Sequence, residues 1–90
     1  MTVFAAGTVT RLYVTYGASG QGLTFIRINI PPAEQPKDNY FRLEQNHPNY
    51  NALYSLALSA AINRYVLRIR TESDITPAEV AQVRYLFVDW

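Results

Sequence analysis

Arginines interspersed with aromatic residues carry the most evident binding chemistry in this 90-residue chain. Six arginines lie in the segments that we expect to form strands, namely Arg11, Arg27, Arg42, Arg68, Arg70 and Arg84. Tyr13, Phe25 and Tyr40 lie among them. Proteins that bind single-stranded nucleic acids use such mixtures, because aromatic rings stack on bases while arginines follow the phosphates.

The overall charge argues against nucleic acid as the first choice of ligand. A net charge of +1 offers little of the counterion-release energy that drives nucleic-acid binding. We therefore expect the arginines to pair with carboxylates of strands and loops across subunit contacts. Binding of single-stranded nucleic acid stays as the alternative function.

Catalytic and metal-binding chemistry has little support. The only histidine, His47, lies beside Pro48 without a second histidine or a carboxylate cluster, so metal binding and nucleophile activation both lack partners. We expect His47 to be solvated or to cap a helix. The seven carboxylates lie mainly in loops or at strand ends and give no general acid and base pair, and the chain has no cysteine. The sequence thus predicts no enzyme, no cofactor and no metal site.

The composition indicates one small domain, residues 1–90, with an apolar surface. Hydrophobic residues make up 49% of the chain and charged ones 17%, below the roughly 25% of average soluble domains. Because so small a domain leaves much of its surface exposed, the apolar excess predicts contact with another subunit. No stretch approaches the roughly 18 consecutive apolar residues of a membrane span, so we expect no membrane insertion.

Alternating apolar and polar residues predict five strands, at 8–16, 23–30, 40–45, 65–71 and 83–90. In the first of them Val9 is out of phase with Leu12, which indicates a β-bulge near Thr10 or Arg11. The glycine-rich residues 17–22 lie between two strands and lack the lysine and helix of a phosphate loop, so they form a hairpin turn. In the last strand we expect Val83, Tyr85 and Phe87 to share one face.

Polar and proline-rich residues predict the connections. We expect the loop at 33–38 to stand clear of the sheet, and a single helical turn at 76–79, where Thr76 and Glu79 have the spacing of a capping box. Asn49 is the expected N-cap of a helix at 50–64. Trp90 is expected to lie against its own domain or a neighbour.

The helix at 50–64 is apolar almost all round. Small, uncharged polar residues form one stripe at a spacing of four, namely Asn51, Ser55, Ser59 and Asn63. A helix of this kind is expected to be buried on more than one side. We therefore predict a homo-oligomer, ring-like in the favoured arrangement, in which Leu56 and Ile62 contact neighbours while the polar stripe faces a narrow channel.

Three strands, one helix and two strands, in the order β-β-β-α-β-β, are the succession of the OB-fold, a five-stranded Greek-key barrel with a helix between strands three and four. The fold class that we predict is therefore mainly β with one α-helix, an OB-fold-like five-stranded antiparallel barrel. The other arrangement with the same elements is a small α+β sandwich.

From about residue 8 to 88 the chain resembles the OB-fold B subunits of bacterial AB-type toxins, those of subtilase cytotoxin and typhoid toxin above all. The resemblance rests on the segments Val-Thr-Arg-Leu-Tyr-Val, Thr-Phe-Ile-Arg-Ile and Val-Leu-Arg-Ile-Arg and on the helix at 50–64. Such subunits form pentamers around a helix-lined channel and bind cell-surface glycans on exposed strand and loop positions. In this chain, positions of that kind are Tyr16, Ser19, Thr24 and Tyr40.

The resemblance implies a non-enzymatic binding subunit and leaves open a catalytic partner chain and a purely structural role. The toxin subunits have a signal peptide and usually a disulfide, whereas this chain has no cysteine and residues 1–7 lack the pattern of a signal peptide. We expect a soluble protein, cytoplasmic by default and secreted if its role is toxin-like.

Overall fold

The computed structural model describes residues 2–31 and 35–89. It is mainly β, with strands β1 (Phe4–Tyr16), β2 (Gly22–Ile28), β3 (Tyr40–Glu44), β4 (Val66–Thr71) and β5 (Ala81–Phe87). The helix α1 (Tyr50–Asn63) connects β3 to β4, and the short 3-10 helix η2 (Lys37–Asn39) precedes β3. Each of these strands and α1 lies within a few residues of its predicted position.

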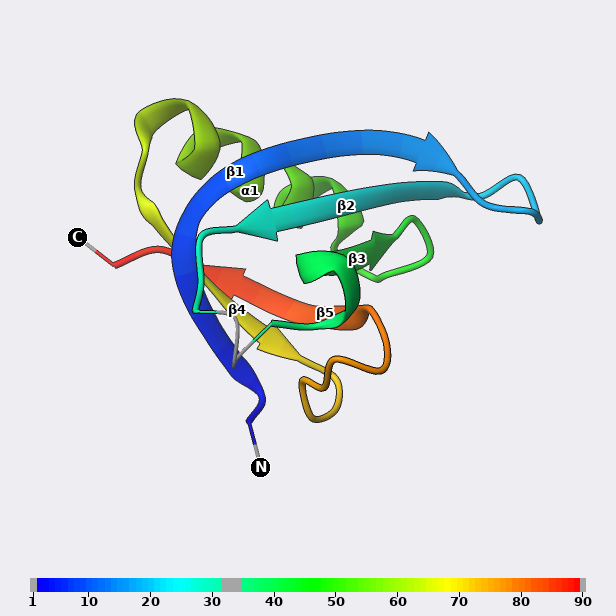
Figure 1. Ribbon diagram of the computed structural model, residues 1–90. Coiled ribbons are helices and arrows are strands. Elements are labelled where there is room, and N and C mark those ends of the chain that lie inside the picture. The colour runs from blue at the N-terminus through cyan, green and yellow to red at the C-terminus, as the bar shows by residue number, and fades with distance from the viewer. Residues whose placement is uncertain (1, 32–34, 90) are drawn as a thin grey trace.

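The five strands form one sheet that closes on itself in the order β1-β2-β3-β5-β4 (Figure 1). The prediction of a wholly antiparallel sheet is wrong, because β3 and β5 pair in parallel through Phe41 with Ala81 and Arg42 with Gln82. The reason is geometric. When an odd number of strands closes into a ring, strand direction cannot alternate at every step, so at least one neighbouring pair must be parallel.

Strand β1 belongs to both halves of the closed sheet, because Phe4–Thr8 pairs with β4 and the remainder pairs with β2. It arches over the molecule in Figure 1, and two features permit the bend. The register with β2 shifts between Val9 and Arg11, which confirms the predicted bulge. A Cβ atom on Gly7 would lie 2.4 Å from the Asn29 carbonyl oxygen, so only glycine permits this close approach.

The hydrophobic core lies inside the closed sheet and beneath α1. Its fully buried side chains come from alternate positions of the strands, as predicted, and the largest are Phe41, Ile26, Ile28, Leu43, Leu67 and Ile69. Helix α1 contributes Leu53, Ala57 and Ala60. Because small residues occupy two of these three positions, the helix axis can lie close to the sheet.

The tip of the β1–β2 hairpin projects from the molecule (Figure 1). The residues 13–16 and 18–20 are exposed, and the turn is held by hydrogen bonds from Gly17 N–H to the Gln21 carbonyl and from Gly20 N–H to the Gly17 carbonyl, both 2.9 Å. Gly20 has a φ of 83°, a conformation that favours glycine. This confirms the hairpin turn predicted from the glycine spacing.

In β5, the prediction that Val83, Tyr85 and Phe87 share a face is wrong. The register with β4 shifts between Arg70 and Thr71, so that Thr71 pairs with Val83 and Arg70 with Tyr85. Arg84 is thus an extra residue in β5 with no residue opposite it in β4. This bulge turns Tyr85 outward, while Val83 and Leu86 both point into the core.

Two predicted connections also differ from the structure. Residues 76–79 form a hydrogen-bonded turn and a bend, and no helix. The predicted free-standing loop at 33–38 instead packs on the molecule where it is described, because Pro36 is buried and Lys37 N–H donates to the Glu79 carbonyl at 2.9 Å. Asn39, which follows with a φ of 61°, is buried and donates from Nδ2 to the Ile28 carbonyl at 3.0 Å. Residues 33 and 34 and Trp90 lie outside the described residues.

Candidate ligand-binding face

The outer side of β1, β2 and β3 gathers arginine and aromatic side chains. The strand register places Arg11 beside Arg27, Tyr13 beside Phe25, and Tyr40 beside Arg27. Side chains at the intervening positions, such as Ile26 and Phe41, are buried in the core, so this set points outward. We call it the arginine–aromatic face, and it consists of Arg11, Tyr13, Phe25, Arg27, Tyr40 and Arg42.

The three aromatic rings of this face contact one another. Tyr13 and Phe25 are stacked, with ring centroids 5.1 Å apart and an angle of 25° between the ring planes. The Tyr40 ring meets both edge-on, at 5.6 Å from Tyr13 and 5.9 Å from Phe25. Aromatic pairs of this geometry stabilise a fold by about 0.5–1.5 kcal/mol beyond the contribution of their buried area. The rings of Tyr13, Phe25 and Tyr40 therefore hold one another in place and form a ring platform that is partly open to solvent.

The three arginines of the face differ in their partners. Arg11 Nη1 donates to the Tyr40 hydroxyl at 3.1 Å, and Arg42 forms an ion pair with Glu44 at 2.9 Å. Arg27 is exposed, and its guanidinium has no ion-pair or hydrogen-bond partner within residues 2–31 and 35–89. Within the described residues, Arg27 is therefore the cation of this face that an anionic ligand could approach without breaking a contact with another side chain.

The four residues assigned to glycan binding do not lie in one place. Tyr16, which is 76% exposed, and Ser19 lie on the projecting hairpin, whereas Tyr40 belongs to the arginine–aromatic face. The expectation that Thr24 is exposed is wrong, because its side chain is fully buried and its hydroxyl lies 2.8 Å from that of Tyr50. Thr24 thus links β2 to the first residue of α1.

The six residues assigned to an oligomer interface lie mostly on the outside of α1. Asn51, Ser55, Ser59, Asn63 and Ile62 are exposed, Ile62 to 72%, while Leu56 packs partly against the core. Asn63 Nδ2 donates to the Ser59 carbonyl at 2.8 Å, so the end of the polar stripe is held within its own helix.

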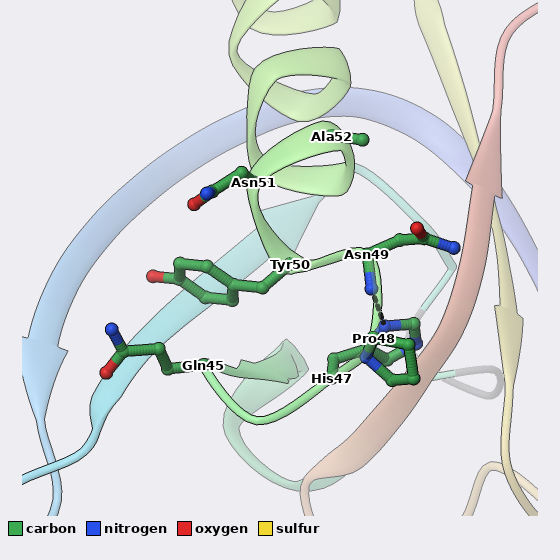
Figure 2. A pocket seen from close by; sticks show the side chains of 7 residues that line it. All are labelled: Gln45, His47, Pro48, Asn49, Tyr50, Asn51 and Ala52. Atoms are coloured by element: carbon green, nitrogen blue, oxygen red, sulfur yellow. Dashed lines mark hydrogen bonds between the residues drawn. The ribbon is translucent and has the colours of Figure 1, made fainter.

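His47 supports the start of α1 beside an open hollow, which is lined by Gln45, His47, Pro48, Asn49, Tyr50, Asn51 and Ala52 (Figure 2). Its Nε2 lies 2.8 Å from the Arg84 carbonyl oxygen, and its Nδ1 lies 3.1 Å from the Asn49 backbone nitrogen. Because a carbonyl only accepts and an amide N–H only donates, the proton of the neutral ring is on Nε2. Asn49 is the N-cap residue, as predicted, but its side chain makes no capping hydrogen bond.

A second aromatic cluster, which the sequence did not reveal, lies on the outer side of β1, β4 and β5. We call it the Phe4 cluster, and it consists of Phe4, Tyr85 and Phe87. Phe4 and Tyr85 meet edge-on at 6.5 Å, Tyr85 and Phe87 are 6.1 Å apart, and the Arg70 guanidinium lies 5.5 Å above the Phe4 ring. Phe4 is 51% exposed and Tyr85 43%, while Phe87 is half-buried, so this cluster presents a partly exposed apolar surface.

In the part of the chain that the structure describes, no three His, Cys, Asp or Glu side chains gather as metal ligands. Nor does any described helix have the length and apolarity needed to cross a membrane. No protein-family model, curated protein or solved structure matches the chain.

Proposed function

We propose that this protein is a non-enzymatic binding subunit that assembles with copies of itself and belongs, by its closed five-stranded sheet and helix, to the OB-fold class. The observation that carries the proposal is the uncovered side of α1. Along its 14 residues the helix has no charged side chain, and its exposed positions include Leu58 and Ile62. A surface helix usually has charged or polar residues on the side that faces water, so the exposed Leu58 and Ile62, on a helix without any charge, favour a covered outer side.

A second copy of the chain fits this side of α1 better than a partner of different composition. The residues Asn51, Ser55, Ser59 and Asn63 each have both a donor and an acceptor in the side chain, so the stripe can hydrogen-bond to uncharged polar groups of a neighbouring copy or to water in a channel. Small residues also allow two helices to approach closely. A partner with a charged surface would leave its charges unpaired against this helix.

The Phe4 cluster supports an assembly with more than one kind of contact. A cyclic oligomer other than a dimer needs two different complementary patches on each chain. Helix α1 and the Phe4 cluster each expose apolar side chains, at different places on a chain whose total accessible surface is 5538 Å². At roughly 800 Å² per partner for a standard contact, two contacts are compatible with that surface. The state implied by the toxin resemblance is a pentamer.

Native mass spectrometry at low micromolar concentration and moderate salt tests this proposal. Since the chain has a mass of 10.2 kDa, five copies would give about 51 kDa. We expect Leu58→Lys and Ile62→Lys to shift the protein toward monomer, because both place a charge in the apolar contact. The matched control is Ser73→Lys, which adds the same charge at an exposed turn between β4 and β5. A monomeric wild-type protein would refute the proposal.

The ligand implied by the toxin resemblance is a cell-surface glycan, bound through residues such as the exposed Tyr16 and Ser19 and the partly exposed Tyr40. A glycan array probed with the wild-type protein tests that implication. The chemistry of the arginine–aromatic face points to a different ligand class, argued next.

A further inference from the structure

We infer that the arginine–aromatic face binds single-stranded nucleic acid, with bases stacking against Tyr13, Phe25 and Tyr40 and phosphates held by Arg11 and Arg27. The inference rests on the part of the proposed function that makes the chain a binding subunit, and it does not require the assembly. It assigns one ligand class to one defined surface.

The charge of the molecule is divided unevenly, in a way that its net charge of +1 conceals. Strands β1, β2 and β3 contain three arginines and a single carboxylate, Glu44. The rest of the sequence contains five basic and six acidic residues. The low net charge therefore does not describe these three strands, which carry a local excess of positive charge where a polyanion would contact them.

The arrangement of the side chains matches a ligand in which flat rings and anions alternate. Arg11 and Arg27 are cross-strand neighbours on one side of the ring platform, and Arg42 lies on β3 beside Phe25. Tyr13 is 39% exposed, and both Arg11 and Arg27 are exposed. A single strand of nucleic acid places its bases on aromatic rings and its phosphates on the flanking arginines.

A neutral glycan can interact with the aromatic rings of this face but not with its positive charge. Sugar rings can pack on aromatic side chains, but neutral hydroxyl groups give no reason for the guanidinium of Arg27, which has no ion-pair or hydrogen-bond partner among residues 2–31 and 35–89. A polyanion provides one, because each contact between a phosphate and an arginine releases a bound counterion. The observations on this face therefore favour nucleic acid over a neutral glycan.

Fluorescence anisotropy with a labelled single-stranded 12-nucleotide oligothymidylate tests the inference. Two or three phosphate contacts give a slope of about −1.4 to −2.1 for log K against log salt, at roughly −0.7 per contact. Raising salt from 50 to 200 mM should then weaken binding about 7- to 18-fold. Tyr13→Leu, which keeps an apolar side chain and removes the ring, should weaken binding by about 5- to 150-fold if one base stacks there.

The charge contribution is tested by Arg27→Gln against Arg68→Gln. Both variants lose one exposed arginine, but Arg68 lies on β4, which pairs with neither β2 nor β3. Arg27→Gln should make the salt slope shallower by about 0.7, while Arg68→Gln should leave it unchanged. Circular dichroism melts of each variant identify any loss of binding that comes from unfolding.

Three results would overturn the inference: no binding of the oligonucleotide by a folded wild-type protein, equal losses in Arg27→Gln and Arg68→Gln, or salt-independent binding of a glycan in its place. The proposed assembly and the proposed ligand can be refuted independently of each other. A monomer that binds the oligonucleotide refutes the assembly alone, whereas an oligomer that binds no oligonucleotide refutes the ligand assignment alone.

Discussion

The hydrogen bond between the hydroxyl groups of Thr24 and Tyr50 gives a quantitative test of the structure. Thr24 is fully buried and the two oxygens are 2.8 Å apart. Thr24→Val keeps the shape of the side chain and removes its hydroxyl, while Tyr50→Phe removes the other partner. A typical hydrogen bond contributes about 1 kcal/mol net, so each single variant should lose about that much stability. For a chain of this length, such a loss corresponds to a fall of roughly 4–8 °C in the melting temperature.

The double variant decides whether the two hydroxyl groups act together. If they bond to each other, the second substitution removes nothing that the first has left, and the coupling energy should be about 1 kcal/mol. Denaturant unfolding of the four proteins, at one fixed protein concentration because assembly would shift the midpoint, measures that energy. The bond would be refuted if the stability losses of the two single variants simply add in the double variant. It would also be refuted if the Thr24→Val protein is as stable as wild type. Oligonucleotide binding should be unchanged in all four proteins.

Three further perturbations follow from single contacts. Gly7→Ala forces a Cβ atom to within 2.4 Å of the Asn29 carbonyl oxygen and should cost about 1–3 kcal/mol or more, measured by urea unfolding; a melting temperature equal to wild type would contradict the tight crossing. His47→Ala removes the bonds to the Arg84 carbonyl and the Asn49 N–H and should cost about 1–2 kcal/mol, with faster amide exchange at Asn49; unchanged exchange there would refute its supporting role. Asn39→Ala loses the bond to Ile28 and strains a backbone with φ of 61°, so it should be less stable than Asn39→Gly, which loses the bond alone; the reverse order in thermal melts would refute that account.

Local patterns predicted those parts of the fold that depend on neighbouring residues. Alternation located β2 and β3 and grouped their residues into two faces, and the face that contains Ile26 or Phe41 is the one that the structure buries in the core. The same alternation also placed Thr24 on the buried face, beside Ile26. Its assignment to a ligand site followed from the toxin resemblance, which places such sites at exposed strand and loop positions, and did not take this alternation into account.

Features that depend on distant pairing were missed. The segment Phe4–Gly7 contains two alanines and a glycine, which are poor strand formers, and it becomes a strand by pairing with β4. The Phe4 cluster was missed for the same reason, since it joins β1 to β5 and depends on the bulge that turns Tyr85 outward. The capping-box spacing at Thr76 and Glu79 was misleading because one helical turn does not offset the cost of starting a helix.

The candidate site was predicted in part. The sequence singled out Tyr13, Phe25, Tyr40 and the arginines as a mixture suited to nucleic acid, but the net charge of the whole chain argued against it. Only the strand register shows that Arg11, Arg27 and Arg42 lie on one face of three neighbouring strands, β1, β2 and β3, which together contain a single carboxylate. Charge summed over a sequence cannot report how that charge is distributed in space.

The closed sheet also has a consequence for the order of folding. Strands β1, β2 and β3 pair through connections that are local in sequence, whereas the β4–β5 hairpin joins them through β1 at one edge and through the two parallel residue pairs with β3 at the other. Loop closure over long stretches of chain is slow, so we expect the first three strands to associate early and the C-terminal hairpin to dock last. The whole arginine–aromatic face lies on the early part. During synthesis, the arginine–aromatic face would then form before the ribosome has released β4 and β5, the strands that close the sheet.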